Sequence, residues 1–144
     1  LAAIVARCAR DAAERAAEDG ICIESSPASA IVDGDERRLR ELTRNLLENA
    51  VRHARARVFL ASVQNGRVCS IVVEDDGEGV PLADRERIFE RFYRSRDDGT
   101  GTGLGLPIAR WIARAHGGSL SVGEAGGGGA RFVVTLAAHN HRSG

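Results

Sequence analysis

The sequence predicts an α/β protein, a two-layer sandwich in which three main helices cover one face of a mixed β-sheet. Stretches with apolar residues at helical spacing alternate with short β-rich runs, and the hairpin signal Asn65-Gly66 joins two of these runs. The chain has 144 residues, of which 43% are hydrophobic and 28% charged, so it is long enough to fold around a single core. We therefore expect one domain over residues 1–137 and a flexible C-terminal tail over 138–144.

Three helices are predicted from apolar residues that recur at helical spacing. The first covers residues 1–19 and ends at Gly20, because glycine commonly caps the C-terminus of a helix. The second follows Asp33-Gly34-Asp35 and runs to about Ala54, and the third covers Thr102–His116. A shorter helical stretch is expected over Asp84–Glu90.

About six strands are expected between the helices. They cover Ile21–Glu24 and Ala30–Val32 on either side of a Ser-Ser-Pro turn, Val58–Val63 and Val68–Glu74 in a hairpin, and Ser119–Val122 and Arg131–Leu136 across a glycine loop at residues 126–129. The Arg- and Asp-rich segment Tyr93–Asp98 has no apolar periodicity, so we expect it to be mobile.

The composition excludes several classes of function. Twenty acidic and twenty basic residues cancel, so no positive field favours a nucleic-acid partner. No apolar run approaches the length of about 20 residues that spans a membrane, and the absence of methionine suggests a processed product or a piece of a longer chain. The cysteines Cys8, Cys22 and Cys69 are widely spaced in apolar surroundings, and we expect core thiols rather than a zinc site or a disulfide.

The absence of lysine excludes two schemes for binding a nucleotide. All twenty basic residues are arginine, whereas a Walker phosphate loop and the eukaryotic type of protein kinase both require a lysine. Any phosphate bound by this chain must be held by backbone amides, by a metal ion or by arginine.

A polar stripe is predicted on the second helix. Asn45, Asn49, Arg52 and His53 lie at i, i+4, i+7 and i+8, so they share one face of the helix. Their amide oxygens could bind a hard cation and the guanidinium a phosphate. A solvated surface face is the alternative interpretation.

Two glycine-rich segments suit a nucleotide. Asp75-Asp76-Gly77-Glu78-Gly79 follows a strand, where a carboxylate can accept a hydrogen bond from an exocyclic amine beside a flat base, although a plain connecting turn would look similar. Gly99–Leu106 opens into a helix, whose unpaired amides suit a polyphosphate, and a flexible hinge is the alternative. Between them, Phe89 and Phe92 are expected to be core anchors, and Arg94 is placed to reach a terminal phosphate.

Taken in order, these segments resemble the boxes of the catalytic ATP-binding domain of two-component sensor histidine kinases, in the family that also contains gyrase-type ATPases. Asn45–Ala50 resembles the N box, Asp75–Gly79 the first glycine box, Ile88–Arg94 the phenylalanine box and Gly101–Leu106 the second glycine box. His116–Gly118 and Gly126–Phe132 resemble the closing glycine segment, so the resemblance covers nearly the whole chain.

The resemblance implies a role for each residue that matches. Asp75 would bind the adenine amine, and Asn49 would bind Mg²⁺. Asn45 and Arg94 would be catalytic, with Arg94 as an electrostatic clamp, and residues Tyr93–Thr100 would form a short lid over ATP. The remaining nucleotide-binding residues implied by the family pattern are Asn45, Arg52, His53, Gly77, Gly79, Val80, Tyr93, Gly101, Thr102, Gly103, Leu104, Gly105 and Leu106.

Two departures narrow the function that the resemblance implies. Gyrase-like hydrolases carry a glutamate one turn before the metal-binding asparagine, whereas this chain has Asn45, which cannot act as a general base. The family's phosphoacceptor is a histidine followed by an acidic residue, and none of His53, His116, His139 and His141 is followed by one. We therefore expect slow or absent ATP hydrolysis by the chain alone.

The leading hypothesis is an ATP-presenting domain of a histidine kinase. Its partners would be ATP and ADP, the histidine-containing dimerisation domain of the same full-length protein and a response-regulator receiver domain. It would be a cytoplasmic domain of a membrane-anchored sensor kinase. The alternatives are a gyrase-type ATPase, a serine kinase acting on an anti-sigma antagonist, and a non-catalytic nucleotide sensor.

Overall fold

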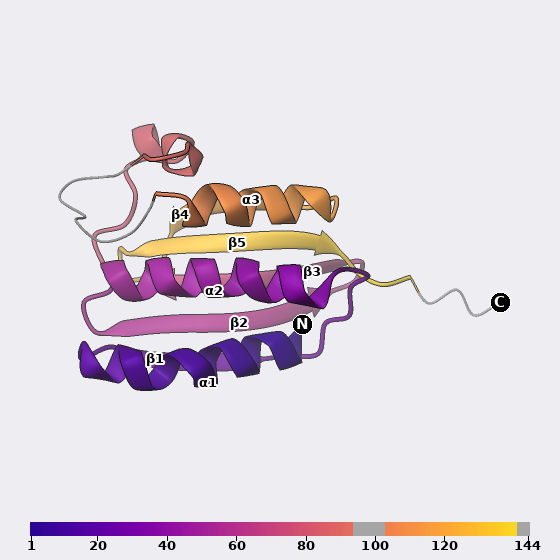
Figure 1. The fold of residues 1–144 in the computed structure, drawn as a ribbon, viewed down its shortest axis with the longest axis horizontal. Helices are drawn as coiled ribbons and strands as arrows, with labels where there is room; N and C mark the ends of the chain where they lie inside the picture. The colour runs from indigo at the N-terminus through magenta and orange to yellow at the C-terminus, as the bar shows by residue number, and fades with distance from the viewer. Residues whose placement is uncertain (94–102, 141–144) are drawn as a thin grey trace.

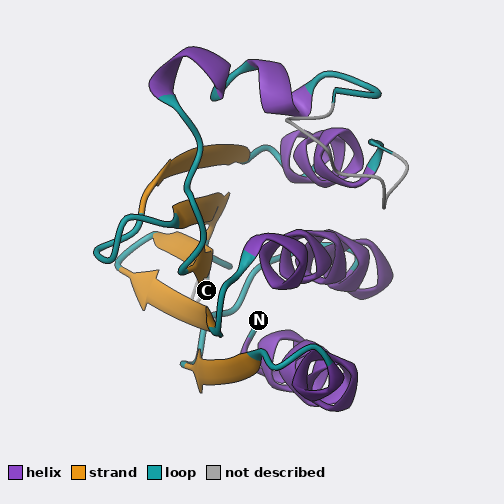
Figure 2. Cartoon of the chain, turned by 90° about the vertical axis from the view of Figure 1, so that its left-hand side faces the viewer, coloured by secondary structure: helices purple, strands orange, loops and turns teal. Residues whose placement is uncertain are grey.

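The predicted two-layer α/β sandwich is confirmed in a computed structural model that describes residues 1–93 and 103–140. Three helices lie side by side over one face of a mixed sheet, and none of the described helices covers the other face (Figure 1; Figure 2). The strand order is β1-β2-β3-β5-β4, with β1 and β2 parallel and the other neighbours antiparallel. In chain order the elements are α1 (Ala2–Glu18), β1 (Cys22–Pro27), α2 (Glu36–His53), β2 (Arg57–Asn65), β3 (Val68–Asp75), η1 (Leu82–Asp84), η2 (Arg87–Phe89), α3 (Gly105–Ala115), β4 (Ser119–Glu124) and β5 (Ala130–Ala137).

The ends of the helices follow local signals in the sequence. The Asp35 carboxylate caps the N-terminus of α2 by accepting a hydrogen bond from the Arg38 amide at 3.2 Å. After α1, Gly20 adopts a φ of +76°, which glycine reaches without a steric penalty. The third helix begins at Gly105 and not at Thr102 as predicted, because Gly103 has a φ of +71° and cannot belong to an α-helix.

The described residues form five strands, where about six were expected. Ala30–Val32 is not a strand, because its backbone finds partners outside any ladder: Ile31 N donates to Gln64 Oε1 at 3.2 Å, and Ile31 O accepts from His139 N at 2.6 Å. The predicted Ser-Ser-Pro turn is part of β1, and Ser25, Ser26 and Pro27 pair with β2. Proline is tolerated there because β1 is an edge strand.

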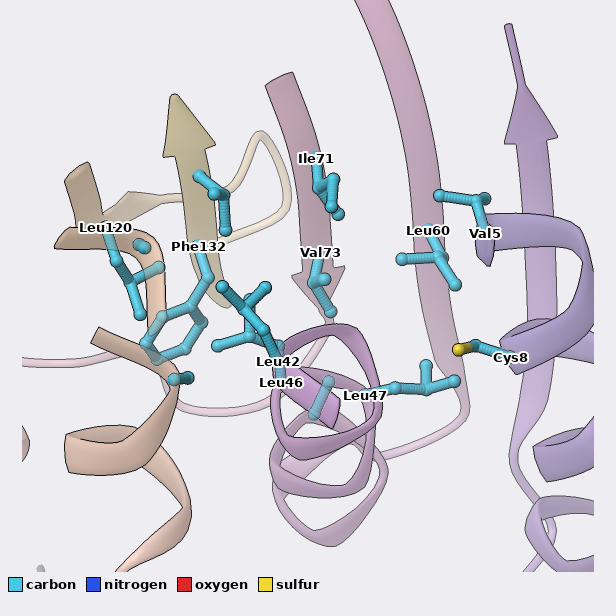
Figure 3. Close-up of a cluster of buried hydrophobic side chains, with 14 of the residues drawn as sticks. Val5, Cys8, Leu42, Leu46, Leu47, Leu60, Ile71, Val73, Leu120 and Phe132 are labelled. Atoms are coloured by element: carbon cyan, nitrogen blue, oxygen red, sulfur yellow. The ribbon is translucent and has the colours of Figure 1, made fainter. Parts of the chain in front are cut away.

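The core fills the space between the helices and the inner face of the sheet (Figure 3). Its largest fully buried side chains come from α2 and from the central strands, and include Leu42, Leu46, Leu47, Leu60, Ile71 and Phe132. Phe89 packs edge-on against Phe132, with ring centroids 6.4 Å apart, and is the core anchor that the sequence predicted.

Three further expectations are corrected. Phe92 is 68% exposed and does not anchor the core. Cys8 and Cys69 are buried thiols as expected, whereas Cys22 lies exposed on the edge strand β1. The expected helical stretch over Asp84–Glu90 consists of the two short 3₁₀ turns η1 and η2.

No helix within residues 1–93 and 103–140 is long and apolar enough to cross a membrane.

The Asp76 carboxylate fastens the end of β3 to the connection between α2 and β2. Its oxygens accept hydrogen bonds from the backbone amides of Arg55 at 2.7 Å, Ala56 at 3.1 Å and Arg57 at 3.1 Å. Because these bonds favour the ionised form, they hold the pKa of Asp76 below its ordinary value. The ionised carboxylate therefore stabilises the fold at neutral pH.

Replacing this carboxylate should weaken the fold in a pH-dependent way. In Asp76→Asn we expect a loss of about 1–2 kcal/mol of unfolding free energy at pH 7, because the neutral amide accepts these hydrogen bonds less strongly. Since the pKa of Asp76 is lowered on folding, its contribution is complete above the ordinary aspartate pKa of about 4 and disappears as the pH falls through the lower pKa of the folded state. Urea unfolding of wild type and variant at several pH values measures the difference.

The matched control is Asp11→Asn, which removes an exposed carboxylate 3.8 Å from Arg7 on α1. Exposed pairs of this kind contribute little, so the control should unfold like the wild type. A difference between wild type and Asp76→Asn that stays the same from neutral to acidic pH would contradict the role assigned to the ionised carboxylate.

Candidate functional site

Segments that are distant in the sequence meet at one end of the sheet, where α2 and β3 end and β5 begins (Figure 1). The carboxylate that ends β3 accepts a hydrogen bond from the first amide of β5 at 3.3 Å, across 55 residues of sequence. The carbonyl oxygen of His53, at the end of α2, lies against the turn that follows β3. The polar stripe of α2 and the first glycine turn thus belong to one site.

Asp75 is the centre of this site. It is only 5% exposed, and its Oδ1 accepts hydrogen bonds from the amides of Gly77 at 2.8 Å and Ala130 at 3.3 Å. Within the described residues, Oδ2 has no hydrogen bond from the protein. One oxygen thus fixes the carboxylate, and the other can accept a hydrogen bond from a ligand.

The glycines around Asp75 allow the backbone to approach closely. A β-carbon on Gly77 would lie 2.2 Å from the His53 carbonyl oxygen, and one on Gly129 would lie 1.9 Å from the Asp75 carbonyl oxygen. Gly79 has a φ of +77°, and a β-carbon there would lie 2.7 Å from the Gly128 oxygen. These positions therefore require glycine, and the turn is more than a plain connection.

Gly129 and Ala130 complete the Asp75 site, but sequence reasoning did not select them. The glycine run at residues 126–129 was interpreted only as a loop and as part of a closing glycine segment. The register of β3 with β5 brings Ala130 to Asp75, and nothing in the local sequence reports that register. The similarity to the closing glycine segment was the one signal that could have found them.

The polar stripe on α2 is confirmed as a geometric feature, since its four residues lie within one helix. Asn49 is only 9% exposed, which argues against a simple solvated face, and Asn45 is half-buried. Arg52 and His53 are exposed in the last turn. A β-carbon on Gly105 would lie 4.0 Å from the β-carbon of Asn45, so the start of α3 lies beside the stripe.

The described part of the second glycine segment forms the start of α3. Leu104 occupies the N-cap position without a side-chain hydrogen bond, and Gly105 and Leu106 begin the first turn. Amides in the first turn of a helix have no partner within the helix and favour an anion. Within the described residues, this helix N-terminus adjoins Asn45.

Three of the predicted site residues, Arg94, Gly101 and Thr102, lie outside the described residues, as does most of the expected lid. Tyr93 is half-buried against the core, with the Arg87 guanidinium 5.5 Å from its ring centroid. Val80 is also partly buried against the core. The nucleotide contacts assigned to these residues stay predictions.

Two hollows in the described surface border the site. A polar hollow of about 270 Å³ contains Gly79 and Val80 together with Gly128 and Gly129. A larger apolar groove of about 660 Å³ runs along the outer side of α3, and among the described residues of the predicted site only Leu104 lines it. The Asp75 region is therefore selected as the candidate site by its hydrogen bonds and burial, and not by the volume of a hollow.

No group of three or more histidine, cysteine, aspartate or glutamate side chains is positioned to hold a metal ion within residues 1–93 and 103–140. A metal bound here would depend on amide oxygens such as that of Asn49 and on oxygens of a ligand. This fits a hard cation that arrives with a polyphosphate better than it fits zinc or another thiolate-bound metal.

Comparison with known proteins gives curated relatives that are sensor proteins. Over 126 residues the chain is 42% identical to the sensor protein ChvG of Rhizobium meliloti, covering 79% of this chain and 22% of the relative. It is 38% identical over 134 residues to the sensor-type histidine kinase PrrB of Mycobacterium leprae, covering 92% of this chain and 30% of the relative. The chain thus spans less than a third of these two relatives.

Solved structures share the fold over nearly the whole chain. Full-length ShkA in complex with AMPPNP matches with a TM-score of 0.84 at 34% identity, over 96% of this chain and 30% of that one. The ATP-binding domain of PrrB from Mycobacterium tuberculosis matches with a TM-score of 0.79 at 31% identity, over 95% of this chain and 93% of that domain.

The family described as histidine kinase-, DNA gyrase B- and HSP90-like ATPase matches residues 34–140, which include α2, the Asp75 turn, α3 and β5. The family match, the identities with sensor kinases and the shared fold all agree, and the chain belongs to the family of histidine kinase-, DNA gyrase B- and HSP90-like ATPases.

Proposed function

We propose that this chain binds ATP with Mg²⁺ and presents the γ-phosphoryl group to a histidine on a separate dimerisation domain of the same full-length protein. A response-regulator aspartate would then take the phosphoryl group from that histidine. The observation that carries the proposal is the buried Asp75 carboxylate, which the backbone holds through one oxygen while the other remains available to a base. The sensor kinases among the relatives, and a structural neighbour solved with AMPPNP, support it.

Asp75 fits the recognition of adenine. The exocyclic amine of adenine donates a hydrogen bond, and Oδ2 of Asp75 can accept it. The amides of Gly77 and Ala130 fix the orientation of the carboxylate before a ligand arrives. Because Gly77 and Gly79 have no side chains, a flat base can approach the backbone of the turn.

The polar stripe and the start of α3 fit the phosphate side. Asn49 is the residue that would hold Mg²⁺ through its amide oxygen, and Asn45 lies one turn earlier, beside Gly105. When bound, the cation neutralises charge on the phosphates and favours departure of ADP. The exposed Arg52 and His53 and the first-turn amides of α3 would surround the same anion.

The chain supplies no nucleophile for the transfer. In the reaction, the lone-pair nitrogen of a neutral imidazole forms a bond to the γ-phosphorus, the bond between this phosphorus and the β–γ bridging oxygen breaks, and ADP leaves with the electron pair, while the proton on the other ring nitrogen passes to a base outside this chain. No histidine of the chain is followed by an acidic residue, so a second domain must provide the acceptor. Catalysis by this chain would then consist of positioning and charge stabilisation, to which Arg94 would contribute.

The small share of its relatives' length that the chain covers supports the same proposal. It spans only 22% and 30% of two sensor-protein relatives, so room remains for a dimerisation domain and a membrane anchor in a protein of that kind. We propose that the chain is the cytoplasmic domain of a membrane-anchored sensor kinase and that it has no nucleic-acid partner.

The base pocket can be tested by changing one carboxylate. In Asp75→Asn, we expect ATP affinity to fall about ten- to hundredfold, because an amide NH₂ would meet the adenine amine, donor against donor. The same NH₂ can donate to the O6 atom of guanine, so the preference for ATP over GTP should narrow. Calorimetric titration with both nucleotides measures the two effects.

The neighbouring Asp76→Asn makes the same chemical change on a carboxylate that holds the α2–β2 connection. This control should bind ATP with nearly unchanged affinity, provided the temperature is kept well below its unfolding transition. Unchanged ATP affinity in Asp75→Asn would show that the base binds elsewhere.

The metal site and the absence of a general base give a second expectation. Mg²⁺ should strengthen ATP binding by the wild type, and Asn49→Ala should remove most of that Mg²⁺ dependence while leaving binding in EDTA largely intact.

Steady-state phosphate release should stay at background, because Asn45 cannot activate water. Sustained turnover by the isolated chain that Asn49→Ala abolishes would favour a hydrolase instead.

Transfer can be tested with the dimerisation domain that we propose for the full-length protein. Mixing the separately expressed dimerisation domain with this chain and γ-labelled ATP should label the dimerisation domain with phosphate that is acid-labile and stable in base. Asp75→Asn should slow this labelling at low ATP. A folded pair that binds ATP but produces no labelled histidine would favour a nucleotide sensor.

A further inference from the structure

The histidine at the end of α3 has no role in the proposed nucleotide contacts, yet its ring joins two distant elements. His116 follows the last residue of α3, and its side chain lies against Gly34 and Asp35, which precede α2. One ring nitrogen makes a hydrogen bond to the backbone of α3 and the other to the residue that caps α2. The ring therefore connects the end of α3 with the start of α2.

The backbone at His116 is fixed by the way α3 ends. Gly117 has a φ of +75°, and the Gly118 amide donates a hydrogen bond to Ala113 O at 2.9 Å. This is the Schellman pattern that closes many helices. A β-carbon on Gly118 would have no room beside Thr135 O, so β5 lies directly against this end of the helix. The direction in which the histidine side chain leaves the backbone is therefore set.

The start of α2 has only half of a capping box within its own sequence. The Asp35 carboxylate accepts from Arg38 N, whereas in a complete box a glutamate or glutamine at the position of Arg38 would accept from Asp35 N. The arginine side chain carries only donors and cannot do so. His116 Nε2 accepts this bond instead, at 3.1 Å and across 81 residues of sequence. The ring thus completes the cap of α2.

The two partners of the ring select one form of the imidazole. Asp35 N is a donor, so Nε2 of His116 must carry a lone pair, and Ile112 O is an acceptor 2.8 Å from Nδ1, so Nδ1 must carry the hydrogen. A β-carbon on Gly34 would lie 2.6 Å from the ring carbon Cδ2. Gly34 has no positive φ, so the ring, and not the backbone conformation, requires glycine at this position.

Helices α2 and α3 lie side by side and run in opposite directions (Figure 1). His116 joins them at one end, and at the other end, about 15 Å along the helices, Gly105 lies beside Asn45. The apolar packing between the two ends has no preferred direction, whereas a hydrogen bond has one. The His116 ring therefore fixes the position of α3 along α2, and with it the first-turn amides of α3 relative to Asn45.

We propose that His116 is a positioning residue of the nucleotide site, whose neutral ring completes the cap of α2 and sets α3 in place for the phosphates. This inference rests on the proposed function, because the phosphates are the ligand that both helices would contact. The base would be bound by Asp75, which is held by the turn after β3 and by β5 instead. Loss of the ring contact should therefore weaken binding of the phosphates and spare binding of the base.

Two substitutions of the histidine test the contact with α2. In His116→Gln the side-chain oxygen can reach the place of Nε2 and accept from Asp35 N, whereas His116→Asn is too short to do so and can donate only to Ile112 O. We expect His116→Asn to weaken Mg-ATP binding about three- to tenfold and adenosine binding less than about twofold. His116→Gln should restore the ATP affinity to within about twofold of the wild type. NMR titration well below the unfolding transition measures both ligands.

A change on the other side of the contact gives a matched pair of variants. Gly34→Ala keeps the histidine but displaces its ring, and should reproduce the selective loss of ATP affinity seen in His116→Asn. Gly123→Ala is the control, because a β-carbon there meets nothing within 4 Å, and it should bind both ligands like the wild type. Nitrogen-15 NMR of the unliganded wild type should also show the His116 hydrogen on Nδ1, a measurement that depends on no variant.

Three results would overturn the proposal. The first is a wild-type ring with its hydrogen on Nε2. The second is His116→Asn that binds Mg-ATP as tightly as the wild type. The third is an equal loss of ATP and adenosine affinity in His116→Asn, which is the outcome of a general loss of structure. A wild-type chain that bound neither ligand would overturn the proposed function itself, and this role with it, whichever nitrogen carries the hydrogen.

Discussion

The burial of the Asp75 carboxylate is the constraint on which the site depends. Burying a carboxylate that is 5% exposed is costly unless hydrogen bonds offset the cost, and here two backbone amides donate to Oδ1, while Oδ2 has no protein donor among the described residues. One amide belongs to the turn after β3 and the other to the start of β5, so the same oxygen fixes both segments. The glycines at 77 and 129 are required because the backbone passes too close for a β-carbon. The side chain that we propose recognises the base therefore also fixes the local fold.

The residue after Asp75 connects this region to α2. Asp76 accepts hydrogen bonds from the amides that follow α2, whereas Asp75 accepts from the turn and from β5. Two adjacent carboxylates thus fix two different sides of the same chain reversal. Since α2 carries Asn45 and Asn49, its position relative to β3 sets the distance between these two asparagines and Asp75, and thereby between the proposed phosphate and base sites.

Helix α3 separates two surfaces with different chemistry. Its N-terminus lies beside Asn45, within the region that fits nucleotide phosphates. Its outer side carries Trp111 and Ile108 and, together with the strained Phe92, forms the apolar groove. The contact between Phe92 and Gly103 fixes the backbone where these two surfaces meet. Both surfaces therefore belong to the same helix.

The sequence alone determined the features that depend on near neighbours: the apolar periodicity of α1 and α2, the hairpin at Gly66, the stripe containing Asn49 and the order of the glycine segments.

Only the tertiary structure decided features that depend on distant partners. Residues 30–32 have the composition of a strand, but their backbone bonds to Gln64 and His139 instead of a ladder. The apolar character of Phe92 predicted burial, whereas its ring is exposed on a backbone that is hydrogen-bonded to Gly103, just before α3. Ala130 reaches Asp75 only through the pairing of β3 with β5. Local patterns specify which face of an element is apolar, but contacts across tens of residues specify which backbone groups meet.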